Sequence, residues 1–492
     1  MKGRAGAVSP QRHGLWINGE SRDGRAGSTV TVEYPYDRST FAEVTAASVE
    51  DVQEAISVAE RAYKDVMRRL PAHERARILR RTSQLIGENA DELIRIVVHE
   101  AGKPVRDARR EVGRARELFD MAADHARQIE GEIVPMDAVS EGENRFGFAL
   151  RVPLGVIAAI APFNSPVNLS TNKIAPALAA GNSVVLKPAS KTPVSALFLA
   201  QLLHEAGLPA GALNVVVGPA EVVGEALVRD QRVRMVTFTG STAAGQRIAQ
   251  LAGIKRLALE LGSSSANIVC ADADIVAAAK SLATSAYMSS GQACIRAQRL
   301  LVHASVAERF LASFIPLVES MRIGDPFDEA TQIGPMVSEG ELQRILSWIE
   351  EARAAGARVL TGGERVGNTV RPTLMSDLPA STRLAREEAF APVATFATFT
   401  SDQEAVALAN GSSYGLQAGV YTHDLDRTLF FARELEVGGL WVNESSRYRQ
   451  DNYPFGGVKL SGIGKEGVKY AIEEMTELKF IGIKTGPSSS IL

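Results

Sequence analysis

Cys294 is the residue of this sequence best suited to covalent chemistry. It stands between a glycine-containing turn at 289–293 and an apolar, strand-like run at 300–302. A cysteine on a turn can present its sulfur to a cleft, whereas Cys270, the only other cysteine, ends an apolar run and is expected to pack as a small hydrophobe. A single cysteine is weak evidence. Taken alone, Cys294 fits a nucleophile and a packed side chain equally well.

Two polar residues at strand ends could assist such a nucleophile. Glu260 lies near the end of the apolar run 257–261, where burial would raise the pKa of its carboxyl group toward the range of a general base. Asn164 follows the apolar run 156–161, and its amide could donate to a developing oxyanion. The alternatives are a glutamate that points into solvent and an asparagine that only closes a turn.

Two further strand ends could hold a cofactor phosphate or ribose. The sequence FTGSTAAG at 238–245 joins a strand to a helix, and the free N–H groups at a helix start bind phosphate. It is not the G-x-G-x-x-G fingerprint of ordinary dinucleotide binding. Lys187 ends another strand-like run, 183–187. Each of these features is ambiguous by itself.

Alternating strands and helices are expected to position these side chains. Continuous apolar strands with crossover helices predict a parallel sheet that is covered on both faces and binds ligands at its carboxyl ends. The first series has strands at 156–161, 183–187, 215–217, 235–239 and 255–261 and helices near 166–180, 193–206, 221–229 and 242–251. The second has strands at 267–270, 300–303, 395–399 and 439–442 and helices near 273–288, 305–320, 338–355 and 402–410. Two α/β domains with a cleft between them follow from this pattern.

The flanking segments have other patterns. The period of the apolar residues predicts long helices at 49–67, 72–100 and 104–128. We expect 129–150 to be an extended, hairpin-like excursion and 478–484 a strand that could pair with another chain. The segments 1–14 and 487–490 are expected to be a frayed tail and a disordered tail.

Composition excludes several classes of function. A net charge of -3 argues against nucleic acid as the main partner. Two cysteines cannot form a disulfide framework, which suits a reducing, cytoplasmic compartment. The N-terminus has no signal-peptide core and no window spans a membrane. The seven histidines stand singly, so we expect no metal site.

The order of these motifs resembles the aldehyde dehydrogenase superfamily, from about residue 16 to 484. The landmarks are PFNSP with Asn164, KPAS with Lys187, FTGSTAAG from Phe238, LELG with Glu260, GQACIRAQR with Cys294, EEAFAP from Glu387 and PFGGVKLSGIGKEG from Pro454. The resemblance implies an α/β fold with a Rossmann-type cofactor domain at 1–128 and 151–261 and an α/β catalytic domain at 262–476. It also implies a small β oligomerisation extension at 129–150 and 477–492, and a homodimer or homotetramer.

The resemblance also implies roles for individual residues. Cys294 would attack the aldehyde carbonyl, while the Asn164 amide and the Cys294 backbone N–H would hold the oxyanion. Hydride would leave to the nicotinamide to give a thioester, which water activated by Glu260 would hydrolyse. Lys173 matches a lysine that lies beside the reacting centre in the family, although packing is an equally good interpretation. The cofactor residues implied are Lys187, Gly240, Ser241, Gly245, Glu388 and Phe390.

The cofactor is expected to be NADP or NAD. Members of the family that prefer NAD often carry a glutamate where this chain has Ser190, and that charge repels a 2′-phosphate. Ser190 is followed by Lys191, so a hydroxyl and an ammonium would tolerate or favour the phosphate of NADP. Ala391 replaces the usual glycine near the nicotinamide, a small change.

The residues expected around the substrate are polar or cationic. Ser165, Asn168 and Asn172 lie on one helical face beside Asn164, where family members that act on apolar aldehydes carry bulky apolar residues. Arg449, Arg447 and Arg114 could bind an anion, since guanidinium groups suit carboxylate, phosphate or sulfonate. A solvated surface position is the alternative for each arginine.

We therefore expect a small polar or anionic aldehyde, and the nearest branch is that of lactaldehyde, non-phosphorylating glyceraldehyde-3-phosphate and phosphonoacetaldehyde dehydrogenases. Ala293 argues against a phosphate, because similar phosphate-handling members carry an arginine there. Arg296 has no role that the sequence assigns.

Three other functions compete with this interpretation. One is an aromatic or succinic semialdehyde-type dehydrogenase. Another is a CoA-acylating relative, but such relatives typically lack the glutamate found here as Glu260. The third is a catalytically silent structural protein, which is expected to have lost Cys294, Glu260 or Asn164. All three residues remain, which favours the hydrolytic enzyme.

Overall fold

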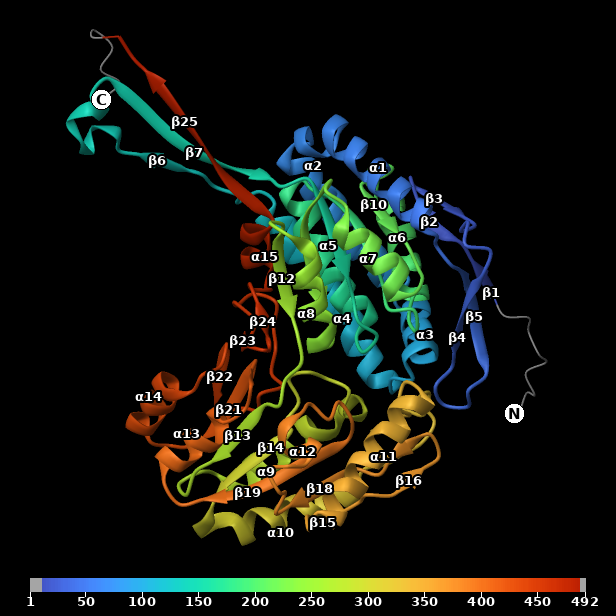
Figure 1. The fold of residues 1–492 in the computed structure, drawn as a ribbon, viewed down its shortest axis with the longest axis vertical. Coiled ribbons are helices and arrows are strands. Elements are labelled where there is room, and N and C mark those ends of the chain that lie inside the picture. The colour runs from blue at the N-terminus through green and yellow to red at the C-terminus, as the bar shows by residue number, and fades with distance from the viewer. Residues whose placement is uncertain (1–10, 487–492) are drawn as a thin grey trace.

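Two sheets with helices around them carry most of the chain, and a narrow β arm projects from one of them (Figure 1). The structure, a computed structural model, describes residues 11–486. The predicted tail 487–490 and the first ten residues of the predicted tail 1–14 lie outside that range. None of the helices in the described part of the chain is long and apolar enough to cross a membrane.

The first sheet has the five predicted parallel strands at its centre, in the order β12-β11-β8-β9-β10. The prediction is confirmed, although β10 begins two residues earlier than expected. Short antiparallel strands extend both edges of the sheet. The strands are β8 Val156–Ile160, β9 Ser183–Lys187, β10 Leu213–Val215, β11 Val233–Thr239, β12 Arg256–Glu260 and, at the edges, β2 Leu15–Ile17, β3 Glu20–Arg22 and β24 Gly462–Ile463.

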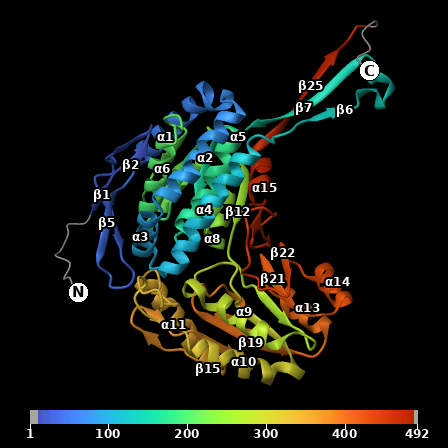
Figure 2. The same ribbon diagram turned by 180° about the vertical axis from the view of Figure 1, so that it is seen from behind.

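Helices connect these strands and cover the sheet (Figures 1 and 2). Those that follow β8, β9, β10 and β11 are α5 Pro166–Ala180, α6 Val194–Glu205, α7 Glu225–Arg229 and α8 Thr242–Ala252. A π-helical turn, η4 Ala220–Gly224, leads into α7. The four that precede β8 are α1 Val49–Asp65, α2 Ala72–Glu88, α3 Ala90–Ala101 and α4 Val105–His125.

The prediction of a single long helix at 72–100 is wrong, because the helix is interrupted at Asn89. The backbone of Asn89 is non-helical (φ -111°, ψ 19°), and its side-chain Nδ2 donates to the carbonyl oxygen of Leu85. An asparagine that bonds a nearby backbone group competes with the helical pattern. The turn lets α3 diverge from α2.

The second sheet has the order β15-β18-β19-β14-β13-β21-β22. Its predicted strands are confirmed as β13 Ala266–Val269, β14 Arg299–His303, β19 Val393–Phe399 and β22 Gly439–Val442. The sequence did not predict β15 Arg358–Thr361, β18 Thr373–Ser376 and β21 Gln417–Tyr421. The helices around it are α9 Ile275–Tyr287, α10 Ala307–Glu319, α11 Glu339–Ala354, α12 Arg383–Arg386, α13 Asp402–Asn410 and α14 Leu425–Glu434. The last helix, α15 Val468–Glu474, packs against α5 and α4 on the first sheet.

The remaining strands form small sheets. The N-terminal sheet consists of β1 Gln11–His13, β5 Thr40–Thr45 and β4 Thr29–Glu33. Two-stranded pairs are β16 Arg365–Val366 with β17 Thr369–Val370 and β20 Tyr414–Gly415 with β23 Val458–Lys459.

The projecting arm is a three-stranded antiparallel sheet of β6 Glu132–Val134, β7 Arg145–Pro153 and β25 Thr476–Lys484 (Figures 1 and 2). The strand expected at 478–484 is present, and it pairs along its whole length with β7 of the same chain. β7 continues to Pro153, so the domain boundary predicted after residue 150 falls inside a strand.

Glu100 links helices α3 and α6 by hydrogen bonds. It lies on α3 with 1% of its surface exposed and accepts the backbone N–H of Val194, 2.9 Å away, in the first turn of α6. The hydroxyl of Ser195 donates to the same carboxyl group. Burial raises the pKa of Glu100 from 4.5 to about 8, although the hydrogen bonds oppose the shift.

This pKa predicts a stability that falls as pH rises. The folded protein keeps a proton on Glu100 that the unfolded chain releases above about pH 4.5, so unfolding releases a proton between that pH and about 8. Glu100→Gln keeps an oxygen acceptor for α6 but cannot ionise. We expect its Tm, measured by calorimetry, to fall less between about pH 6 and about pH 9 than that of the unmodified chain.

Glu92→Gln is the matched control, since Glu92 lies on the same helix but pairs with Arg95 at the surface. It should keep the wild-type slope of Tm against pH. Equal slopes for Glu100→Gln and the unmodified chain would contradict the role given to Glu100.

Candidate active site

Cys294 lies in an irregular turn between the short 3-10 helix η5 Met288–Gly291 and β14. Three consecutive residues of η5 have positive φ: Ser289 (53°), Ser290 (56°) and Gly291 (66°). A Cβ on Gly291 would lie 2.2 Å from the carbonyl oxygen of Ala391, so only glycine fits this close approach. Backbone strain of this kind accumulates at functional sites, where the surrounding structure maintains it.

Contacts from other elements hold the turn. The Asp107 carboxylate accepts both the N–H and the hydroxyl of Ser289 at 3.2 Å. Arg296, for which the sequence assigned no role, is 1% exposed and donates to the carbonyl of Val393 and the side chain of Gln298, both at 2.8 Å. These contacts make Arg296 a fixed support beneath the turn.

The Cys294 thiol is half-buried against a small apolar cluster that includes Ile295 and Phe455. Burial raises its pKa to about 12, with the carboxyl groups of Glu388 and Glu260 adding to the shift. The thiol is therefore protonated in this state, and a reaction needs a proton acceptor near it. Cys270, by contrast, is 1% exposed in the core of the second sheet, where the sequence placed it.

Asn164 lies directly beside the cysteine turn. Its Nδ2 donates to the carbonyl oxygen of Gln292, 2.9 Å away and two residues before Cys294. The Gln292 side chain in turn accepts the N–H of Val337 at 3.0 Å. The fold thus brings together an amide donor from the end of β8 and the candidate nucleophile, 130 positions apart in the sequence.

Glu260 ends β12 on the same edge of the first sheet and is 4% exposed. Burial raises the pKa of its carboxyl group well above the usual range, and the nearby Glu466 carboxylate adds to the shift. Its Oε2 atom is buried without a hydrogen-bond partner in the described residues. Such a group is available to bind and deprotonate water.

Glu466 is a buried carboxylate that the sequence did not single out. It accepts the Lys173 ammonium at 2.9 Å and the Arg449 guanidinium at 2.6 Å. Burial opposes its ionisation, but these two cations hold its pKa at about 2. The Lys173 ammonium also donates to the Thr239 hydroxyl at 2.7 Å. The only sequence signal was the glutamate within the GIGKEG landmark.

The side chain of Arg449 is largely buried, so Arg449 does not occupy the solvated surface position that was the alternative. Its guanidinium carbon lies 3.7 Å from the centre of the Phe455 ring, and its Nη2 reaches Asn172 at 3.4 Å. With Glu466 paired to it, the charge of Arg449 is compensated within the protein.

The other residues expected at the substrate have defined partners. Ser165 accepts the Lys103 ammonium at 3.0 Å, and Asn168 is buried with its N–H on the Glu111 carboxylate. Arg114 binds both oxygens of Asp451, at 3.0 and 2.9 Å. The partners of Arg447 are neutral atoms: Met288 Sδ at 3.0 Å and Ser289 Oγ at 3.4 Å.

The predicted cofactor residues lie at the carboxyl ends of β9 and β11. Lys187 is 5% exposed, and the carbonyl of Pro188 at 3.3 Å is its single hydrogen-bond acceptor in the described residues. Ser241 caps α8 by accepting the N–H of Ala244. A Cβ on Gly245 would lie 2.4 Å from Leu261, so glycine allows the helix to approach the strand. A buried ammonium with free donors beside a helix start fits a nucleotide.

Two more cofactor candidates lie nearer Cys294. Glu388 accepts the N–H of Ser263 at 3.0 Å, and burial raises its pKa to about 7. Phe390 has a φ of 45°, and its ring packs edge-on against that of Phe163, which precedes Asn164. Ser190 donates its hydroxyl to the carbonyl of Gly218 at 2.9 Å.

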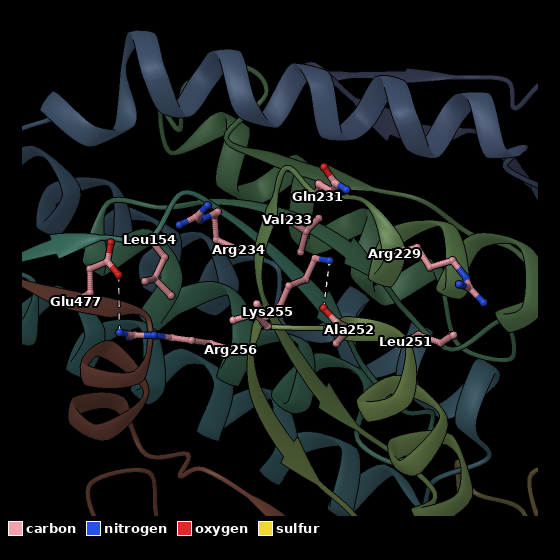
Figure 3. Close-up of a pocket in the computed structure, with 12 residues that line it drawn as sticks. Leu154, Arg229, Gln231, Val233, Arg234, Leu251, Ala252, Lys255, Arg256 and Glu477 are labelled. Carbon is pink, nitrogen blue, oxygen red and sulfur yellow. Dashed lines mark hydrogen bonds and ion pairs between the residues drawn. The ribbon is translucent and has the colours of Figure 1, made fainter.

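Hollows also occur away from these residues. One of ≈ 560 Å³ is lined by side chains that include Arg229, Arg234, Lys255 and Arg256, which Figure 3 draws. It lies at the amino ends of β11 and β12 and contains none of the predicted site residues. Ligands of open α/β sheets bind at the opposite, carboxyl ends of the strands. Volume alone therefore does not identify the site here.

Comparison with known proteins agrees with this geometry. The model of the aldehyde dehydrogenase family matches residues 22–481. A 3-sulfolactaldehyde dehydrogenase of Priestia aryabhattai is 42% identical over 471 residues, which cover 96% of this chain and 98% of the relative.

Two solved structures are also close to this fold. ALDH21 of Physcomitrella patens, in complex with the reaction product succinate, has a TM-score of 0.94 and 34% identity and covers 98% of this chain and 100% of that one. The glyceraldehyde-3-phosphate dehydrogenase GapN of Methanocaldococcus jannaschii, complexed with NADP, has a TM-score of 0.89 and 38% identity and covers 93% and 99%.

The environment of Lys187 predicts pH-dependent cofactor binding. Burial lowers the pKa of its ammonium to about 8, so the positive charge is present below that pH and is lost above it. The affinity for NADP⁺, measured by calorimetry, should fall several-fold between about pH 7 and about pH 9. Lys187→Met should bind about 10-fold more weakly at pH 7 and show a flatter dependence. An unchanged pH dependence in that variant would assign the effect to another group.

Proposed function

Because the chain belongs to the aldehyde dehydrogenase family, we propose that it oxidises a small polar or anionic aldehyde to the carboxylic acid with NAD⁺ or NADP⁺. The observation that carries the proposal is the proximity of Cys294, Asn164 and Glu260: the Asn164 amide is 2.9 Å from the carbonyl of Gln292, two residues before Cys294, and Glu260 is near enough to raise the pKa of Cys294. Nucleophile, oxyanion donor and base are the parts that this reaction needs.

Cys294 begins the reaction by adding its sulfur to the aldehyde carbon as the thiol proton passes to solvent water. The Asn164 Nδ2 and the Cys294 backbone N–H donate to the oxygen, which becomes negatively charged. A nicotinamide held beside Glu388 and Phe390 would supply the acceptor for the hydride that leaves the same carbon. The product of this half-reaction is a thioester on Cys294.

Glu260 completes the reaction with water. Its carboxylate takes one proton as the water oxygen adds to the thioester carbon, and the Cys294 sulfur then leaves as the acid is released. The fixed negative charge of Glu466 beside it raises the pKa of Glu260 and makes it a stronger base. Lys173 and Arg449 keep Glu466 ionised and so act through it.

The proposed cofactor choice includes NADP. Ser190 and Lys191 carry no negative charge that would repel a 2′-phosphate. Glu221 lies close enough to Lys187 to raise its pKa, so one carboxylate does face this region. The similar GapN structure contains NADP. We therefore propose that both cofactors are used.

The arm supports a homodimer or homotetramer. β25 lies at the edge of the three-stranded sheet, and its Leu478, Phe480 and Ile483 are 53%, 52% and 48% exposed. Exposed apolar residues on an edge strand favour association with another chain. We also propose a cytoplasmic location, which the two unpaired cysteines suit.

A panel of aldehydes tests the proposed function. We expect reduced cofactor to form with lactaldehyde, sulfolactaldehyde, succinic semialdehyde or glyceraldehyde-3-phosphate, assayed with each cofactor. Cys294→Ser should lower the rate by about 10³-fold or more and leave cofactor binding intact, since a hydroxyl is a far weaker nucleophile. Cofactor binding without turnover of any aldehyde by the unmodified chain would reject the enzyme in favour of a silent structural protein.

Glu260→Gln separates the two half-reactions. Steady-state turnover should fall by about 10²-fold or more, while a rapid first burst of NADPH remains, because the thioester still forms. In the unmodified chain the hydrolysis rate should rise with pH, since the raised pKa of Glu260 delays its ionisation. Stopped-flow absorbance measures both quantities. If Glu260→Gln lost the burst, and the hydrolysis rate of the unmodified chain did not change with pH, Glu260 would not act in the hydrolytic step.

A further inference from the structure

Two arginines from distant segments converge on one uncharged atom near Cys294. Arg447 Nη2 lies 3.0 Å and Arg110 Nη1 3.3 Å from the sulfur of Met288. A thioether is a weak acceptor and carries no charge. The guanidinium groups therefore approach each other without a shared anion between them.

None of the other charges around this pair forms an ion pair with it in the described residues. Asp107 is the carboxylate whose charge acts most on Arg447; its Oδ2 accepts two bonds from Ser289, and its Oδ1 is buried without a hydrogen-bond partner, 3.9 Å from Arg106. Arg114, one turn further along α4, is neutralised by both oxygens of Asp451.

Arg110 and Arg447 themselves form no ion pair within residues 11–486. The Nη1 atom of Arg447 is buried and has no hydrogen-bond partner there. A buried donor without an acceptor is costly, and two like charges in proximity add to that cost. An anion that accepts from both guanidinium groups would remove both penalties.

The pair lies beside the reacting sulfur. Ser289, which Arg447 contacts, belongs to the same turn as Cys294, and Cys294 is near enough for its ionised form to raise the pKa of Arg447. Arg449 differs, because Glu466 already neutralises it. Arg447 and Arg110 thus carry charge near the cysteine turn that no ion pair within the described residues compensates.

We propose that Arg447 and Arg110 bind the terminal oxyanion of the substrate, such as the sulfonate or carboxylate of a short aldehyde, while its carbonyl lies against Cys294. This rests on the proposed aldehyde oxidation and names the group that selects the substrate. Arg447 is the main ligand because its donors are buried, and Arg110 is a second, solvent-exposed one.

Sulfolactaldehyde and lactaldehyde provide a matched pair of substrates, since they differ by one sulfonate. The quantity to measure is the ratio of kcat/KM for sulfolactaldehyde to that for lactaldehyde. Arg447→Gln should lower the ratio about 30-fold or more, chiefly through KM, because a buried charge-assisted contact is lost. Arg110→Gln should lower it roughly 5-fold, since solvent and salt screen an exposed charge. Arg447→Lys should restore part of the ratio.

Arg109→Gln is the control, because Arg109 is the exposed neighbour of Arg110 on α4 and pairs with Glu329. It should leave the ratio unchanged. Cofactor affinity and Tm verify that each variant is folded. A ratio unchanged by Arg447→Gln in an active, folded protein would overturn the assignment, and so would an equal loss with both substrates.

Direct binding distinguishes failure of this assignment from failure of the proposed function. Sulfolactate, the product acid, is titrated calorimetrically into the protein with NADP⁺ bound. Binding that Arg447→Gln abolishes supports the anion site even if the unmodified chain oxidises no aldehyde, in which case only the proposed function fails. Equal binding of sulfolactate to the unmodified chain and to Arg447→Gln would reject the anion site alone, as would no binding to either.

Discussion

A buried carboxylate held between two cations organises the reactive edge of this protein. Glu466 receives Lys173 from α5 and Arg449 from the segment that follows β22, so three distant parts of the chain meet at one charge. Removing one partner of such a buried pair costs about 3–5 kcal/mol, because it leaves an uncompensated ion. The arrangement therefore resists rearrangement, and the Glu466 charge adds to the rise that burial causes in the pKa of Glu260, while Arg449 and Lys173 oppose that rise.

Helix α4 joins this edge to the cysteine turn. Its Asp107 holds Ser289, its Glu111 accepts the N–H groups of Val167 and Asn168 at the start of α5, and its Arg114 binds Asp451. These three residues recur at the spacing of one helical face. The turn of Cys294, the helix that follows Asn164 and the segment that contains Asp451 are thereby placed against a single helix.

The local pattern of apolar residues in the sequence predicts many of the strands and helices of the fold. Strands β8 and β9 at the centre of the first sheet are buried on both faces, so each appears as an apolar run that the sequence reveals. β21 was missed because Gln417 and Gly419 interrupt its apolar character, although every residue in it is buried. The break at Asn89 was missed because a side-chain bond to Leu85, and not periodicity, ends α2 there.

Residue types and motif order alone specified the family, the parallel α/β architecture and the identity of Cys294, Asn164 and Glu260 as candidates, since these depend on local pattern and on resemblance. Tertiary packing decided which charges are compensated. Lys173 meets Glu466 across 293 positions, Arg114 meets Asp451 across 337, and Arg447 and Arg110 converge on Met288. Sequence spacing carries no information about such encounters, because they depend on how helices and turns from both sheets meet. Burial, which sets the pKa of Cys294 and of Glu260, is likewise a property of the folded chain.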